Sequence, residues 1–241
     1  TTGTANTALG RTALGANTTG ASNTAVGYLS LDANTTASNN TAMGYAALGA
    51  NTTGAGNSAL GESSLDANTT GSDNTAIGKG ALGANTTASN NTAVGKDAML
   101  VNTTGTANVA VGKGAYIAGT TGSNNVAIGD AALYANTTAD NNTAIGKSAL
   151  VANTTGTENT VIGALAGDAI TTGNNNTAMG HNSLGTNIIS DHNVAIGNDA
   201  LATHNTGSSI DAYNVAVGSG AGFAVTTGKQ NTFIGGNAGD A

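Results

Sequence analysis

A motif of the form Asn-x-small-aliphatic-Gly recurs along the whole chain with a period of seventeen residues. It begins at Asn6 and is found at every seventeenth position up to Asn193, and then at Asn214 and Asn231, which makes fourteen repeats. The step from Asn193 to Asn214 is twenty-one residues, so one repeat carries four extra residues. A strict period of this length indicates a solenoid, in which each repeat forms one coil and is stable only against its neighbours.

Each repeat contains too many turn-forming residues for a helix. Gly and Asn recur through every repeat, and most repeats also hold a Thr-Thr pair. Short runs such as residues 74–78 and 81–87 lie between these turn residues and indicate two short strands in each repeat. We therefore predict an all-β fold, a single parallel β-solenoid domain over residues 1–241. It would have fourteen coils of seventeen residues, with a four-residue insertion near residues 204–213, and form a fragment of a longer array or fibre.

Positions within a repeat are numbered here as columns, with the opening Asn as column zero. Column zero is always Asn and column eleven is mostly Asn, and stacked Asn side chains can bond the same residue one coil away. Column four is Gly in every repeat, which predicts a structural turn with positive φ or a close approach of neighbouring backbones. The column-four residues are Gly10, Gly27, Gly44, Gly61, Gly78, Gly95, Gly112, Gly129, Gly146, Gly163, Gly180, Gly197, Gly218 and Gly235.

The apolar columns predict that the strands are covered on both faces. Column three is aliphatic, as at Ile145, and the neighbouring column two is almost always Ala. Adjacent strand residues point to opposite faces, and a single thin coil can cover only one of them. The second cover should come from another copy of the chain, so we expect self-association as a homotrimer. Self-association into an end-to-end polymer is a separate alternative.

Three repeats point to a contact inside the coil between columns two and eight. Column eight changes from Leu to Gly at Gly167, Gly222 and Gly239, and in two of these repeats column two grows from Ala to Val161 and to Phe233. An exchange of volume between two columns is what close packing requires.

Composition excludes several classes of function. Six Lys and Arg against thirteen Asp and Glu give a net charge of -7, which disfavours nucleic acid as a partner. No apolar run is long enough for a membrane-spanning helix, and the absence of Cys removes disulfides and thiolate metal sites. Thirteen carboxylates are scattered over fourteen coils without a regular His partner, so we expect no enzyme activity, no cofactor and no metal site.

Column five is the clearest candidate for an exposed column. Five of the six basic residues are in it, namely Arg11, Lys79, Lys96, Lys113 and Lys147. Two interpretations remain open. The column could bind an anionic polysaccharide, or it could be a solvated face that keeps strands from pairing edge to edge.

The insertion is the one irregular feature of the array, and rigid scaffolds often carry recognition on such loops. We predict that a discrete ligand would contact His204, Ile210, Asp211 and Tyr213. Metal binding by His192, His204, Asp191 or Asp211 is an alternative, and a simple tolerated bulge is another. All three histidines of the chain, His181, His192 and His204, lie in the stretch from His181 to Tyr213 that contains the insertion.

The unit NTAIGxxAL, which runs through the fourteen repeats, resembles the head-domain repeat of YadA-type trimeric autotransporter adhesins. It is also similar to the solenoid shafts of phage tail fibres and S74-type fibre proteins. The resemblance implies a left-handed parallel β-roll in which three chains pack side by side. It implies a location at a bacterial cell surface or in a virion fibre, and a host surface protein or glycan as partner.

The leading hypothesis is a non-enzymatic extracellular fibre or adhesin segment that supplies a rigid shaft for surface attachment. One alternative is an extracellular filament subunit that assembles end to end. Another is an ice-binding solenoid, because Thr columns repeat from coil to coil. Against the last, the two Thr of each NTT are adjacent and should point to opposite faces of a strand.

Overall fold

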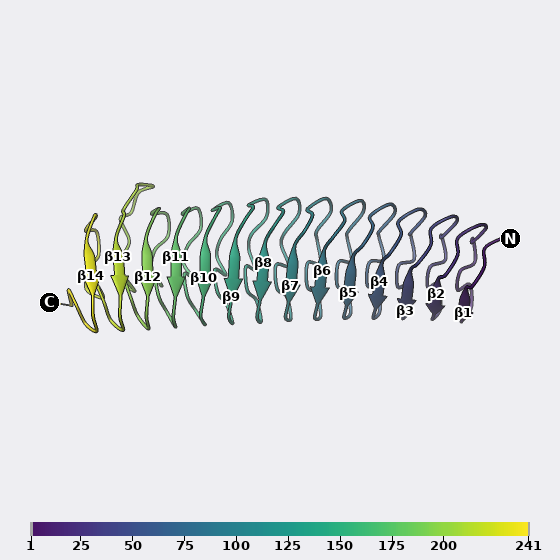
Figure 1. Cartoon of the computed structure of the whole chain (residues 1–241), viewed down its shortest axis with the longest axis horizontal. Helices are drawn as coiled ribbons and strands as arrows, with labels where there is room; N and C mark the ends of the chain where they lie inside the picture. The colour runs from purple at the N-terminus through teal and green to yellow at the C-terminus, as the bar shows by residue number, and fades with distance from the viewer. Residues whose placement is uncertain (1, 241) are drawn as a thin grey trace. The chain divides into compact units, whose positions relative to one another are not determined.

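The fold was obtained as a computed structural model, which describes residues 2–240. It is an all-β parallel β-solenoid, with one three-residue strand in each repeat and no helix among the described residues. The strands follow one another in chain order (Figure 1). They are β1 (Thr7–Leu9), β2 (Thr24–Val26), β3 (Thr41–Met43), β4 (Ser58–Leu60), β5 (Thr75–Ile77), β6 (Thr92–Val94), β7 (Val109–Val111), β8 (Val126–Ile128), β9 (Thr143–Ile145), β10 (Thr160–Ile162), β11 (Thr177–Met179), β12 (Val194–Ile196), β13 (Val215–Val217) and β14 (Thr232–Ile234).

The chain divides into two compact units, Thr1–Gly122 with β1 to β7 and Ser123–Ala241 with β8 to β14. Inside each unit, neighbouring strands pair in parallel with a shift of seventeen residues, as in Ala76 with Ala93 and Ala127 with Ala144. The exception is β12 with β13, where Ala195 pairs with Ala216. The predicted seventeen-residue coil is therefore confirmed, and the extra residues lie between β12 and β13.

The second strand that the sequence predicted in each repeat is absent. Residues 81–87 form turns and a bend, and Leu82 in column eight has a φ of +51°. A left-handed residue turns the chain, so Ala81 and Leu82 both lie inside the coil although they are adjacent. The left-handed conformation costs about 1–2 kcal/mol for a residue with a side chain, and complete burial of Leu offsets it by about 2–3 kcal/mol.

The column-four glycines lie where each strand ends and the chain turns. All fourteen have φ between +121° and +140°. A Cβ built on Gly78 would lie 2.6 Å from the carbonyl oxygen of Gly95 in the next coil. Both the conformation and the close backbone approach therefore exclude any larger residue from this column.

The interior of each coil combines a small apolar core with two ladders of Asn side chains. Ala76, Ala81 and Leu82 are fully buried, and so are Asn74 and Asn85 in columns zero and eleven. The Nδ2 of Asn85 donates to Oδ1 of Asn68 at 2.8 Å, and the backbone N–H of Asn74 donates to Oδ1 of Asn57 at 3.0 Å. Each buried amide thus bonds the same residue one coil away, which removes most of its desolvation cost.

The column-eleven ladder is broken where another residue replaces Asn. In this column, Asn102 is followed one coil later by Gly119, and Asn153 is followed one coil later by Ile170. The Oδ1 atoms of both Asn residues are buried without a hydrogen-bond partner. At Gly119 the space is taken by the ring of Tyr116, which would lie 2.4 Å from an added Cβ. The two orphaned acceptors therefore lie before two of the four positions at which column eleven is not Asn, which are Gly119, Ile170, His204 and Val225.

The predicted contact between columns two and eight is confirmed. A Cβ built on Gly167 would lie 3.4 Å from Val161 Cγ2 and 3.0 Å from Ile170 Cδ1. The ring of Phe233 lies against both Gly222 and Gly239, at 3.0 Å and 2.3 Å from their built Cβ positions. One large column-two side chain therefore fills the space left by glycine in two successive coils.

Candidate functional surfaces

The insertion between β12 and β13 is attached to the preceding coil through its backbone. The N–H of Asp191 donates to the carbonyl of Ile210 at 3.0 Å, and the N–H of Ala212 donates to the carbonyl of Asp191 at 3.0 Å. Gly207 at its outer part is exposed, and a Cβ built there would meet nothing within 4 Å. The inserted residues therefore extend outward from a fixed base, as Figure 1 shows beside β13.

A surface cluster of His192, Asp211 and Tyr213 lies at the base of this insertion. His192 Nδ1 is 2.9 Å from Asp211 Oδ1, and the rings of His192 and Tyr213 have their centroids 5.0 Å apart. The Tyr213 hydroxyl donates to Asp211 Oδ2 at 3.1 Å. That hydrogen bond and the negative charge of Asp211 raise the pKa of Tyr213. Two of the four predicted ligand residues, Asp211 and Tyr213, are thus in contact and exposed, and Ile210 beside them is half-buried.

His204 does not belong to this cluster, which corrects the sequence prediction. It is fully buried, and its Nε2 lies 3.4 Å from Nδ2 of Asn214. His204 is eleven residues after Asn193, so it occupies column eleven and replaces an Asn of the interior ladder. Burial lowers the pKa of its imidazole. A histidine enclosed in this way cannot contact a surface ligand.

His192 was considered in the sequence only as a metal ligand, and its contacts with Asp211 and Tyr213 were not foreseen. The available signal was its place in column sixteen, the same column as Tyr213 one coil later. In residues 2–240 no group of three or more His, Cys, Asp or Glu side chains is arranged to hold a metal. With His204 in the interior, the four-residue metal set is not brought together.

The outward face of the strands carries the second candidate surface. In β5, Ala76 is fully buried while Ile77 in column three is 40% exposed, and in β4 Leu60 is 48% exposed. The large column-three residues that are exposed are Leu9, Met43, Leu60, Ile77, Ile128, Met179 and Ile234. The strands are therefore apolar on both faces, with column two inside the coil and column three outside.

The Thr pairs lie in bends rather than strands, so the strand geometry from which opposite faces were expected is absent there. In the pair at 86 and 87, Thr86 is half-buried and Thr87 is exposed. The Thr86 hydroxyl donates to the carbonyl of Thr103 in the next coil at 3.2 Å. The hydroxyls of column twelve, the column of Thr86, are used in hydrogen bonds to the next coil. In this bend, the column of Thr87 is the exposed Thr column.

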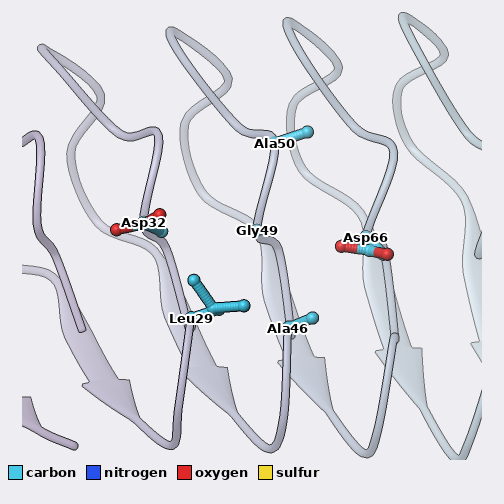
Figure 2. Close-up of a pocket in the computed structure, with 6 residues that line it drawn as sticks. All are labelled: Leu29, Asp32, Ala46, Gly49, Ala50 and Asp66. Carbon is cyan, nitrogen blue, oxygen red and sulfur yellow. The ribbon is translucent and has the colours of Figure 1, made fainter. Parts of the chain in front are cut away.

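A shallow cavity of about 260 Å³ lies over three successive coils of the first unit. Asp32 and Asp66 flank it, with Gly49 between them (Figure 2). All three residues are in column nine, so the hollow exists because glycine alternates with aspartate there. Burial raises the pKa of Asp66.

The chain matches no protein-family model, no curated protein and no solved structure. In the described part of the chain, no helix has the length and apolar character needed to cross a membrane. The surfaces described above are therefore the basis on which a function is inferred.

Proposed function

We propose that the chain is a non-enzymatic structural segment of an extracellular fibre or adhesin, in which three copies pack side by side through the outward strand face. The observation that carries the proposal is the exposed column of aliphatic residues in column three. The resemblance of the NTAIGxxAL repeat to trimeric adhesin heads and tail-fibre shafts supports the same arrangement, a left-handed β-roll at a bacterial surface or on a virion.

Self-association follows from the energetics of this face. Covering the exposed part of a residue such as Ile77, which is 40% exposed, stabilises a complex by about 1 kcal/mol. The same contact recurs in successive coils, so weak contacts add along the chain. Contiguous apolar surface on a soluble protein is typical of an interaction site.

The proposal is tested by the native mass of the full chain and of one strand-face variant. Light scattering should give three times the chain mass of 22.9 kDa for the parent protein. The double variant Ile77→Lys and Ile128→Lys should be monomeric with an unchanged circular dichroism spectrum, because both side chains point outward. Thr87→Lys adds a charge on another exposed column and should remain trimeric.

A monomeric parent whose stability is independent of concentration would contradict the proposal. So would a mass that grows without limit as concentration rises, which is the behaviour of the end-to-end filament. Substitution of Leu82 or Leu133 by Asp is not a useful test of assembly, because both side chains are buried inside their own coils. Those variants should unfold the coil instead. A thermal hysteresis assay on the parent distinguishes the ice-binding alternative.

A further inference from the structure

A single exposed column in the first unit contains basic and aromatic residues on successive coils. This basic–aromatic column is column five, the position directly after the turn glycine. Its members are Arg11, Tyr28, Tyr45, Glu62, Lys79, Lys96 and Lys113, and all seven are exposed. Because the coils stack in register, these side chains form one line with a spacing of about 4.8 Å.

Positive charge in this unit is confined to that line. Residues 1–122 contain four basic residues, and all four are in the column together with one acidic residue, Glu62, so the column has a net charge of +3. The other four acidic residues of the unit, Asp32, Asp66, Asp73 and Asp97, lie in other columns and give the remainder a charge of -4. A positive line on an acidic surface favours a narrow anionic partner over a broad one.

Three lysines stand on consecutive coils, which is unfavourable without a counter-charge. Lys79, Lys96 and Lys113 repel one another at the coil spacing. Lys79 Nζ is 2.9 Å from Glu62 Oε1, and Lys96 Nζ is 3.6 Å from Asp97 Oδ2. The Lys79–Glu62 pair is exposed to water, and in the second pair Lys96 is exposed while Asp97 is half-buried. Ion pairs with such access to water are weak and easily exchanged for another anion.

The N-terminal end of the same line offers aromatic faces. The ring centroids of Tyr28 and Tyr45 are 5.8 Å apart, and the Arg11 guanidinium carbon is 5.5 Å from the Tyr28 centroid. Tyr28 is 43% exposed and Tyr45 is 52% exposed. The negative face of an aromatic ring attracts the weakly positive C–H groups of a sugar ring.

We infer that the basic–aromatic column binds a linear anionic polysaccharide, with its carboxylates against the lysines and Arg11 and its sugar rings against the tyrosines. One acidic sugar unit is about as long as one coil is high, so successive carboxylates of the polysaccharide can lie against successive cations of the column. A nucleic acid is a poorer fit, because its denser charge is repelled by a chain with a net charge of -7. This inference does not depend on the proposed trimer, which uses column three.

The experiment is isothermal titration of the full chain with an oligogalacturonate of defined length at low salt. The parent should bind, and affinity should fall as salt rises. Substitution of Lys79, Lys96 and Lys113 by Gln should weaken binding about tenfold or more. Tyr28→Ala with Tyr45→Ala should also weaken it several-fold, and a neutral cello-oligosaccharide should bind the parent more weakly than the acidic one.

Lys229 provides the matched control, because it is the one basic residue of the chain outside column five. Lys229→Gln should leave the affinity unchanged. The inference is overturned if the parent does not bind the oligogalacturonate, if Lys229→Gln weakens binding as much as the triple variant, or if single-stranded DNA of equal charge binds as tightly. A triple lysine variant with an altered native mass would also overturn it, because the column would then be a contact between copies.

Discussion

The break in the Asn ladder at Gly119 provides a test of how the coils are held together. Tyr116 and Gly119 stand where other coils have Leu and Asn, as in Leu82 and Asn85. In that coil, Asn85 Nδ2 bonds Asn68 Oδ1 at 2.8 Å. Replacing Tyr116 by Leu and Gly119 by Asn together should restore the bond to the orphaned acceptor of Asn102, which is otherwise buried without a partner.

The single substitutions should destabilise the protein and the double should not. Gly119→Asn alone places a Cβ 2.4 Å from the Tyr116 ring, and such overpacking costs about 1–3 kcal/mol. Tyr116→Leu alone leaves a cavity, which costs about 1–3 kcal/mol, and the Asn102 acceptor stays without a partner as in the parent. In the double variant the buried Oδ1 of Asn102 gains a hydrogen bond, which removes a cost of about 1–3 kcal/mol. Because each single substitution costs about 1–3 kcal/mol and the double variant is not destabilised, we expect a favourable coupling free energy of about 2–6 kcal/mol between the two sites.

Urea unfolding followed by circular dichroism at one protein concentration measures these free energies. The reciprocal change, Leu82→Tyr with Asn85→Gly, is the matched control in a regular coil. It should cost about 1–3 kcal/mol because it orphans Asn68 Oδ1. Additive effects of the two substitutions at Tyr116 and Gly119, or a double variant less stable than either single one, would refute the ladder as a source of stability.

Three further predictions follow from the interior and the insertion. Gly78→Ala should cost about 3 kcal/mol or more in urea unfolding, because φ is +130° and the new Cβ would lie 2.6 Å from the Gly95 carbonyl oxygen. Because burial lowers the pKa of His204 below its ordinary value of 6.5, the unfolded chain binds a proton there that the folded protein resists, so stability should fall as pH falls below 6.5. His204→Asn should lose this pH dependence in thermal unfolding across that range, and an unchanged profile would show that another group is responsible. Deletion of residues 207–210 should give β12 and β13 the seventeen-residue register. It should cost only about 1 kcal/mol, because the main loss is one backbone hydrogen bond to Asp191. Complete loss of the circular dichroism signal would contradict this expectation.

The candidate site at the insertion could be predicted only in part. The extra residues are visible as a break in the period, and loops on repeat scaffolds are exposed, so Asp211 and Tyr213 could be expected at the surface. His204 was misplaced because a histidine near a loop suggests a ligand, whereas its column number places it inside the coil. His192 contacts Asp211 from one coil to the next, across the insertion. The sequence did not predict this contact, because the repeat pattern does not show how the inserted residues fold.

The period, the all-β class and the parallel register were determined by the sequence alone. In-register stacking places every seventeenth residue in the same structural environment, and the chain repeats the residue types that suit each environment. The glycine of column four shows the same, since one conformation at one corner excludes all other residues. Only the tertiary structure decided what lies between the corners. The residues from 81 to 87 read as a strand, yet Leu82 is left-handed, because a coil of seventeen residues must turn several times to close on its own small core. The energy of burying that leucine exceeds its local backbone preference, and such a balance depends on neighbours one coil away that a single repeat does not contain.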